Sequence, residues 1–210
     1  MARKPADQTV SRKAILMAAA DVLRRHGYDA TTMKDIAAAV NLTAASLYHH
    51  FPNKDALLLA VLEAGLEHAI AQLEPIARSD QPAADRLRAM IRVHVVSLTS
   101  HTAVGAAMIF ESRSLLALKP GSGSDDLLAR RDAFFARRDH FENLFRQVIQ
   151  AGVDRGEFQP VDVPIFVKTM LGAHNWVAVW YREGGRLTGA QIADQMADIF
   201  LRALCQPTGS

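Results

Sequence analysis

Residues 41–51 read NLTAASLYHHF, a short segment that opens on polar residues and ends on a tyrosine, two histidines and a phenylalanine. Thr43 can cap a helix over about residues 44–50, because a threonine side chain accepts a hydrogen bond from the first N–H groups of a helix. Asn41 stands where the chain must turn, and asparagine tolerates the left-handed conformation better than most residues. Pro52 then breaks the helix. The segment therefore predicts a tight turn followed by a short helix with a polar face.

Two helices are predicted before this turn. The first follows Ser11 and stops at Gly27, because glycine commonly ends helices. Its apolar residues, which recur at helical spacing, are Ile15, Ala19, Val22 and Leu23. The second begins at Thr32, which forms a variant of the capping box with Asp35 three residues later. Its apolar face is Met33, Ile36, Ala37 and Val40. Three short helices with a tight turn between the second and third predict a helix-turn-helix.

The chain after the turn reads as helical throughout. Asn53 can cap a long amphipathic helix that begins with Leu57 and Leu58. Further helical patterns cover residues 83–100, 104–117, 125–152, 162–183 and 189–204. No alternating strand pattern competes with them. The expected fold class is all-α, with about nine helices: an N-terminal three-helix helix-turn-helix domain and a C-terminal helical bundle for dimerisation and ligand binding.

The predicted domain organisation has four parts. Residues 1–10 form a flexible arm and residues 11–55 the helix-turn-helix domain. Residues 56–204 form the ligand-binding and dimerisation domain, and residues 205–210 a tail. The Gly-Ser stretch 121–124 lacks the third glycine and the preceding strand of a phosphate-binding loop, so it predicts a flexible connection.

Composition indicates a globular protein. The chain has 210 residues, half of them hydrophobic, and we expect no apolar run to reach the roughly 18 residues of a membrane span. Its single cysteine, Cys205, cannot form an internal disulfide, and its N-terminus shows no secretory signal, so we expect the cytoplasm and no membrane partner. Residues 1–55 carry a balance of +3 and residues 56–210 a balance of −1. The basic surplus on the N-terminal module suits a phosphate-bearing partner.

The third helix of a helix-turn-helix enters the major groove of DNA. Leu42, Leu47 and Phe51 are expected to point inward. The residues left for DNA are Thr43, Ala44, Ser46, Tyr48, His49 and His50, with Thr32 and Lys54 as additional phosphate donors. Small hydroxyl side chains allow close approach to bases, and tyrosine and histidine can donate to phosphates. The alternative is that the Tyr-His-His run is an ordinary helix surface.

The stretch TTMKDIAAAVNLTAASLYHHFPNKDALLLAVLEAG, residues 31–65, resembles the N-terminal domain of the TetR family of bacterial transcriptional regulators. The resemblance implies a homodimer on a palindromic double-stranded DNA operator, and a repressor released by a small-molecule effector. It places seven residues against DNA: Thr32, Thr43, Ala44, Ser46, Tyr48, His49 and Lys54. The chain departs from the family pattern at Asn41, where glycine is common, and at Ala44, where a larger residue is frequent.

Two C-terminal segments predict a dimer interface. Residues 162–183 are apolar around nearly the whole helix, and a helix of that kind is buried on two sides. A bundle on one side and a second subunit on the other would meet this requirement. The predicted interface residues are Trp180, Ile192, Met196, Ile199 and Phe200. The alternative is an interior core helix of a monomer.

The segment RRDAFFARRDHFENLF, residues 130–145, places arginines among phenylalanines. Arg131 and Arg138 lie seven residues apart, on the helical face that carries Phe134 and Phe141. A buried arginine needs a partner, and Arg138 has Glu142 four residues on. Arg131 has no acid at such offsets, so a distant carboxylate such as Glu111 or Asp162, or an anionic ligand, is expected to complete it.

The stretch LGAHNWVAVWYREGG, residues 171–185, resembles a TetR subgroup that includes regulators of fatty-acid and sterol-side-chain breakdown responding to acyl-coenzyme A thioesters. The resemblance implies an acyl-CoA effector. The predicted ligand-binding residues are Arg131, Phe134, Arg138, Phe141, Asn175 and Trp176. A free aromatic or fatty acid, a neutral or cationic aromatic drug, and a ligand-independent DNA binder are the alternatives.

The sequence gives little support for an enzyme. Its eight histidines are scattered, and no glutamate is followed by a histidine three residues later, as di-iron bundles require. His94 and His101 share a helical face without nearby carboxylates. Cys205 lacks the neighbours that activate a nucleophile. We therefore predict no catalytic residue, no cofactor and no metal site.

Overall fold

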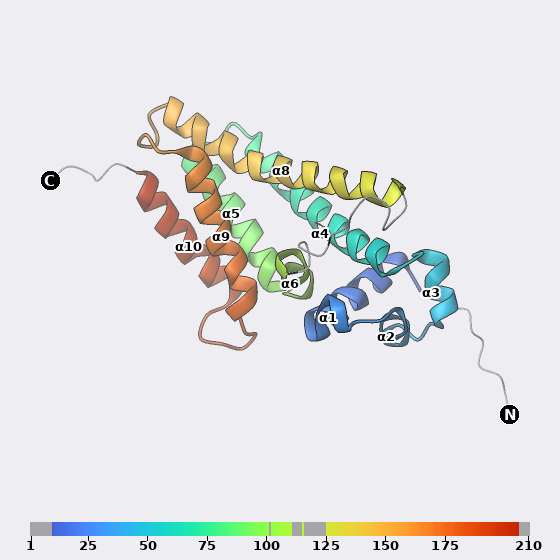
Figure 1. Cartoon of the computed structure of the whole chain (residues 1–210). Coiled ribbons are helices and arrows are strands. Elements are labelled where there is room, and N and C mark those ends of the chain that lie inside the picture. The colour runs from blue at the N-terminus through green and yellow to red at the C-terminus, as the bar shows by residue number, and fades with distance from the viewer. Residues whose placement is uncertain (1–9, 101, 111–114, 116–124, 206–210) are drawn as a thin grey trace.

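The computed structural model describes residues 10–100, 102–110, 115 and 125–205. The regular secondary structure within these residues is entirely helical. Figure 1 shows the N-terminal helices at one end of the molecule and the bundle of later helices at the other. Nine helices lie in the described part of the chain, so the predicted all-α class with an N-terminal helix-turn-helix and a C-terminal bundle is confirmed.

The N-terminal helices are α1 (Arg12–Ala30), α2 (Met33–Ala39) and α3 (Ala44–His50). The predicted end of the first helix at Gly27 is only partly right. The backbone kinks there, at φ 73° and ψ 167°, and a further helical segment then continues to Ala30. Thr32 forms the predicted capping box with Asp35. The side chain of Thr43 caps α3 as predicted, by accepting a hydrogen bond from the Ser46 backbone N–H.

A small apolar core holds these three helices together. Ile15 of α1, Ile36 of α2 and Leu47 of α3 are almost fully buried in it. Phe51, just after α3, is buried as predicted, whereas Leu42 is only half-buried. Three residues of α4 complete this core: Leu57, Ala60 and Val61. The position of α3 is therefore fixed by apolar contacts to all of its helical neighbours in this domain.

Helix α4 (Lys54–Ala77) runs from the small core into the bundle. Leu58, Leu59 and Leu62 face the larger core of the bundle. In the sequence they alternate with the residues of α4 that face the smaller core. Contrary to the expectation from sequence, α4 is long and apolar enough to cross a membrane. A little over half of its most apolar 18-residue window, 56%, is buried inside the protein, as in the core helix of a globular protein.

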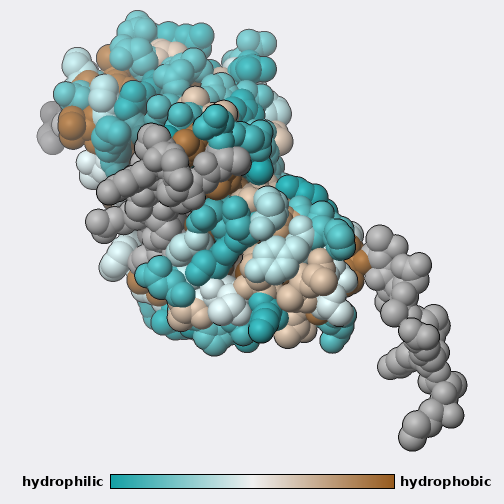
Figure 2. Space-filling view, turned by 45° about the vertical axis from the view of Figure 1, so that its right-hand side comes forward, coloured by the Kyte–Doolittle hydropathy of each residue, from teal (hydrophilic) through white to brown (hydrophobic). Residues whose placement is uncertain are grey.

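The bundle is completed by α5 (Ala83–Ser100), α6 (Thr102–Phe110), α8 (Asp125–Asp154), α9 (Val163–Trp180) and α10 (Gly189–Leu204). In Figure 1, α8 lies along α4, while α5 packs with α9 and α10. Most of the described surface in the view of Figure 2 is hydrophilic, and apolar side chains appear there in small separate patches.

Most predicted helix ranges in the bundle agree closely with the structure. The predicted 162–183 helix ends three residues early, because the backbone is extended at Tyr181 and left-handed at Gly184. The predicted 104–117 helix is observed as far as Phe110. Most of its remainder lies outside the described residues, as do the 121–124 loop and nearly all of the predicted arm and tail.

The turn before α3 gives a stability prediction. Asn41 has φ 55°, in the left-handed region that favours glycine. Replacing Asn41 with alanine should therefore lower the free energy of unfolding by about 1 kcal/mol, whereas Asn41→Gly should leave it nearly unchanged. Urea unfolding of the three proteins measures the difference. Equal stability of the alanine and glycine variants would show that the turn does not require this conformation.

Candidate functional site

Helix α3 presents a polar face to solvent. The side chain of Leu47 is fully buried and anchors the helix, while Tyr48 is 51% exposed. The other predicted DNA residues fall into two groups: Thr43, His49 and His50 are exposed, and Ala44 and Ser46 are half-buried. Ala45, which the sequence pattern did not single out, is also exposed. This arrangement suits a helix that lies in a groove of DNA, because its anchored face and its accessible face are distinct.

The hydroxyl groups at the two helix starts are already engaged. The Thr43 hydroxyl lies 2.8 Å from that of Ser46 and accepts a hydrogen bond from the Ser46 backbone at 3.0 Å. The Thr32 hydroxyl donates to Asp35 at 2.6 Å, and the hydrogen bonds from Thr32 lower the pKa of the Asp35 carboxyl. Thr32 and Thr43 therefore position the N-terminal turns of α2 and α3, where free N–H groups favour an anion.

The Lys54 side chain, predicted to be a phosphate donor, is engaged within the protein. Its ammonium donates to the carbonyl oxygens of Tyr28 at 2.7 Å and Thr31 at 2.9 Å, and lies 4.1 Å from the centre of the Tyr28 ring. The Tyr28 hydroxyl also donates to Asp55. These contacts tie the end of α1 to the start of α4. Lys54 thus links the N-terminal helices to the bundle.

Two cations near α3 were missed from sequence. Lys34 is exposed on α2, and the Arg12 guanidinium lies 5.2 Å from the centre of the Phe51 ring. Lys34 could have been found from sequence, because it follows Thr32, the predicted cap of the second helix, by two residues. The packing of Arg12 on Phe51 depends on tertiary structure and had no local signal.

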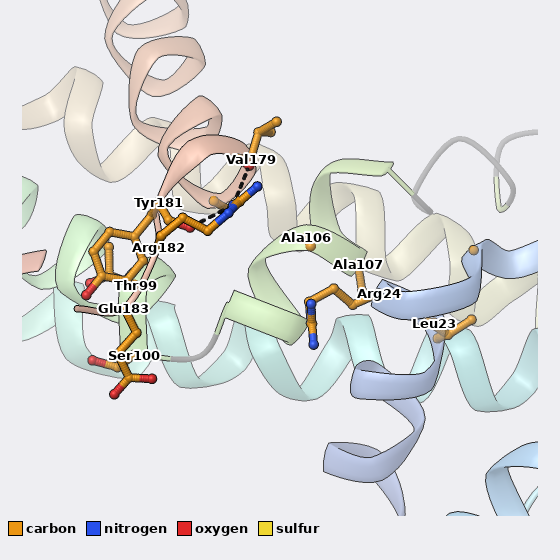
Figure 3. A pocket seen from close by; sticks show the side chains of 12 residues that line it. Leu23, Arg24, Thr99, Ser100, Ala106, Ala107, Val179, Tyr181, Arg182 and Glu183 are labelled. Atoms are coloured by element: carbon orange, nitrogen blue, oxygen red, sulfur yellow. Dashed lines mark hydrogen bonds between the residues drawn. The ribbon is translucent and has the colours of Figure 1, made fainter. Parts of the chain in front are cut away.

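A cavity of about 730 Å³ lies between the N-terminal domain and the bundle. Figure 3 shows Arg24 of α1 on one side, with Ala106 and Ala107 of α6 nearby, and Tyr181, Arg182 and Glu183 on the other. The ends of α5 and α9 complete its wall. Arg24 pairs with Asp21 at 2.9 Å, and Arg182 donates to the carbonyl oxygens of Val179 and Tyr181. None of the six predicted ligand residues lines this cavity.

The expectation that no local acid serves Arg131 is wrong. Its guanidinium binds the adjacent Asp132 at 2.7 and 2.9 Å, an offset of one residue that a search at helical spacings overlooked. Arg138 is exposed, and Glu142 pairs with Arg146 and Lys168 instead. The alternative acid Glu111 lies outside the described residues.

The remaining predicted ligand residues are dispersed. Phe134 and Phe141 are buried in the large core. Trp176 is 58% exposed on the outside of α9. Asn175 is half-buried and raises the pKa of the buried His94 ring slightly, against the larger effect of burial.

His94 of α5 and His174 of α9 lie in the centre of the bundle, with ring centres 5.6 Å apart. Both are buried, and His174 is fully so. Burial lowers the pKa of His94 to about 4, against a smaller opposing effect of the Asn175 hydrogen bond. Burial also lowers the pKa of His174 well below its ordinary value, and the nearby His94 adds to this effect. Both rings are therefore neutral near pH 7.

The predicted dimer residues do not all reach the surface. Trp180 and Ile199 are exposed, Met196 is half-buried, and all three line a groove of about 500 Å³ between α9 and α10. Ile192 is buried in its own chain, and Phe200 packs on Phe166 and His174. Ile192 nevertheless lines the same groove, so it lies at the base of this face.

Within the described residues no group of three or more His, Cys, Asp or Glu side chains is placed to hold a metal ion. Cys205 is an exposed free thiol.

Comparison with known proteins identifies two matching family models. Residues 15–61 match the model described as bacterial regulatory proteins, tetR family. Residues 80–204 match the model described as tetracyclin repressor-like, C-terminal domain. Together they cover the helix-turn-helix and most of the bundle.

Individual proteins are similar over nearly the whole chain. The HTH-type transcriptional repressor KstR2 of Rhodococcus jostii (strain RHA1) is 30% identical over 99% of each chain. The crystal structure of AibR in complex with isovaleryl coenzyme A and operator DNA is 29% identical, with a TM-score of 0.74 over 89% of this chain and 96% of that one. The ketosteroid transcriptional regulator KstR2 of Mycobacterium tuberculosis has the same fold, with 24% identity and a TM-score of 0.82 over 98% and 100% of the chains.

The positions of Lys54 and Lys34 predict different effects, the first on stability and the second on DNA binding. Lys54→Met should lower the free energy of unfolding by roughly 1–3 kcal/mol, because two carbonyl oxygens lose a charged donor. The matched variant Lys34→Met should change stability by less than about 0.5 kcal/mol and weaken binding to all DNA sequences, with a salt slope smaller by about one. Urea unfolding and fluorescence anisotropy at several salt concentrations measure both. An unchanged stability of Lys54→Met would contradict the linking role.

The buried histidines predict a pH dependence of stability. The unfolded chain takes up a proton on His94 near pH 6.5, whereas the folded chain does so only near pH 4. The unfolded state binds more protons between these values, so the free energy of unfolding should fall as the pH drops from 6.5 towards 4, by up to about 3 kcal/mol for His94. Urea unfolding between pH 8 and 4.5 tests this. His94→Gln should flatten the curve, and a flat curve for the unmodified protein would contradict the prediction.

Proposed function

Because the chain belongs to the TetR family of bacterial transcriptional regulators, we propose that it is a repressor released from its operator by an acyl-coenzyme A thioester. Regulators of this family bind operator DNA as dimers and respond to small-molecule effectors. The family and the names of the relatives indicate a transcriptional repressor rather than an enzyme. The identity of the effector as an acyl-coenzyme A thioester is the more specific part of the proposal.

The proposal of DNA binding rests on the arrangement of α3, which we call the reading helix. Leu47 and Phe51 hold α3 from below, while Tyr48 and His49 face solvent beside the capped start of the helix. We assign residues 11–55 to DNA binding and residues 56–204 to dimerisation and effector binding. A palindromic operator follows from two reading helices related by a two-fold axis.

The exposed apolar face of α9 and α10 is assigned to the dimer. Trp176, Trp180 and Ile199 are each about half or more exposed, although large apolar side chains are usually buried. They lie on or beside one groove rather than scattered over the surface. A contiguous apolar face of this kind is typical of a subunit interface.

The cavity between the domains is assigned to the effector. Its volume lies within the range of about 300–1,000 Å³ that is usual for small-molecule sites. A ligand in it would touch α1 on one side and α6 and α9 on the other. With Arg131 occupied by Asp132, the argument for an anionic effector moves to Arg24 and Arg182, two arginines that line this cavity.

Release from DNA then requires a difference in affinity between two conformations. An effector shifts the protein only towards the conformation that binds it better. Because the cavity is bounded by both domains, a thioester that fits a wider separation of α1 from α6 would favour an altered spacing of the two reading helices. The isovaleryl-CoA complex of AibR supports this class of effector, and an uncharged or cationic aromatic ligand is the alternative.

The effector class is tested by DNA release. Isovaleryl-CoA or octanoyl-CoA at saturation should weaken binding to an operator fragment about 5- to 150-fold by fluorescence anisotropy, the usual range of allosteric coupling. Coenzyme A alone, free octanoate and a cationic aromatic dye are the comparison ligands. Arg182→Gln should reduce release by the thioesters, whereas Arg155→Gln, an exposed arginine after α8, should not. Release by the dye and not by the thioesters would support the alternative.

The dimer assignment is tested at Ile199. Replacing this exposed residue with glutamate should give a monomer by analytical ultracentrifugation and weaken operator binding about 100-fold or more, because the second reading helix no longer binds in the same complex. Met17→Glu, which also places an acid at an exposed apolar position, should remain dimeric. A dimeric Ile199→Glu protein would place the interface elsewhere.

A further inference from the structure

The centre of the bundle contains a polar pair in an aromatic setting. The centre of the His94 ring lies 5.2 Å from the ring centre of Phe141 and 6.2 Å from that of Phe145, both on α8. The His174 ring lies 5.5 Å from Phe200 of α10. Four helices therefore meet at the two histidines: α5, α8, α9 and α10. The pair connects segments that lie about 80 residues apart in the chain.

Three of the four ring nitrogens have no hydrogen-bond partner among the described residues. They are Nε2 of His94 and both Nδ1 and Nε2 of His174, and all three are buried. Buried polar atoms in native proteins are nearly always hydrogen-bonded, and each exception needs an explanation. Leucine or phenylalanine would fill the same space without this cost. The orphaned nitrogens therefore point to a partner that binds at this place.

The chemistry of the pair selects an uncharged partner. A neutral imidazole offers one N–H donor and one acceptor nitrogen. A buried carboxylate would need a cation or a protonated ring beside it, whereas burial favours the neutral form of both rings. A ketone oxygen can accept from one ring, and a hydroxyl can also donate to the other. The phenylalanines around them suit the apolar frame that carries such an oxygen.

The pair lies close to the cavity between the domains. His94 precedes Thr99 by five residues on α5, and His174 precedes Ala178 by four residues on α9, and both later residues line the cavity. At about 1.5 Å per residue, the histidines lie roughly 6–8 Å deeper along these helices. Leu98 and Ala178 pack closely against Gly105 of α6 between the two places. Leu98 stands between His94 and Thr99 in the sequence of α5, so a ligand that reached the pair from the cavity would pass this contact.

We propose that His94 and His174 bind an uncharged oxygen, a ketone or a hydroxyl, on the apolar part of a ligand that enters from the cavity. His174 is the main contact, because neither of its ring nitrogens has a partner among the described residues. Entry requires displacement of Leu98. This inference rests on the proposed effector cavity and adds a specificity rule to it: oxygenated acyl groups bind better than plain ones.

The first experiment compares thioesters that differ by one oxygen. Octanoyl-CoA is compared with its 3-oxo, 5-oxo and 7-oxo forms by isothermal titration calorimetry. At least one oxo form should bind the unmodified protein tenfold or more tightly than octanoyl-CoA. In His174→Leu this ratio should fall to about one, with operator affinity in the absence of ligand unchanged. His140→Gln, a histidine that pairs with Glu74 outside the core, should keep the ratio.

A second measurement does not depend on coenzyme A. 2-Octanone should raise the melting temperature of the unmodified protein more than octane does, and His174→Leu should abolish that difference. Long-range ¹H–¹⁵N NMR of the histidine rings should show a shift of the His174 nitrogens on addition of 2-octanone, while those of His140 stay constant. A purely structural histidine pair would not respond in this way.

The outcomes separate the two proposals. If the thioesters fail to bind while 2-octanone acts through His174, the thioester proposal falls and the histidine site stands. If thioesters bind and release DNA without preference for an oxo form, and 2-octanone leaves the His174 nitrogens unchanged, the histidine site is refuted and the proposed function stands. A preference that persists in His174→Leu also refutes the histidine site.

Discussion

The burial of α4 on two sides is the constraint on which the rest of the structure depends. Leu57 and Val61 belong to the small core beneath the reading helix, whereas Leu58 and Leu62 belong to the core of the bundle. A helix that fills two cores cannot turn about its axis without disturbing both, because protein interiors are closely packed. Any shift of the bundle that moves α4 therefore moves α3 as well. The contact of Lys54 with the end of α1 strengthens the same connection.

Charges on the outer faces of the bundle set the alignment of its helices. Arg130 and Arg137 of α8 bind Glu63 and Glu67 of α4, at 2.6 and 2.7 Å, and His140 binds Glu74 at 2.8 Å. On the opposite side, α5 and α10 are joined by Arg88 with Asp198 and by Arg92 with Asp194. Exposed pairs of this kind add little stability, about 0–1 kcal/mol each. Their regular order along the helices instead favours one register of parallel α4 and α8.

Local signals in the sequence predicted the reading helix well. They could not predict contacts between residues that are far apart in the chain. The caps at Thr32 and Thr43 and the left-handed Asn41 depend on residues three or four positions away, which a sequence shows directly. Lys54, by contrast, bonds residues 23 and 26 positions away, and no spacing rule indicates such a contact.

The bundle shows the same division. Apolar periodicity predicted where its helices lie but not how far each apolar side chain is exposed: Ile199 of α10 is 61% exposed, whereas Ile192 is 6% exposed. The expectation that no nearby acid serves Arg131 was wrong for a different reason. Only helical offsets were considered, and its acid is the adjacent residue. The histidine pair was missed because its members meet only in the folded chain.

The polar pair in the bundle has a consequence for how the protein can be switched. An apolar core between α5 and α9 would be more stable, but it would give a ligand no directional contact there. Orphaned nitrogens raise the free energy of the closed state, so a ligand that satisfies them gains both its own hydrogen bonds and the relief of that cost. Such a ligand binds the opened bundle better than the closed one, and this difference in affinity is what a population shift requires. On the proposed route to the pair a ligand passes the contact of Leu98 with Gly105 of α6, and α6 packs on both α1 and α4. The energetic defect in the core and the position of the reading helix are therefore connected through one chain of packed helices.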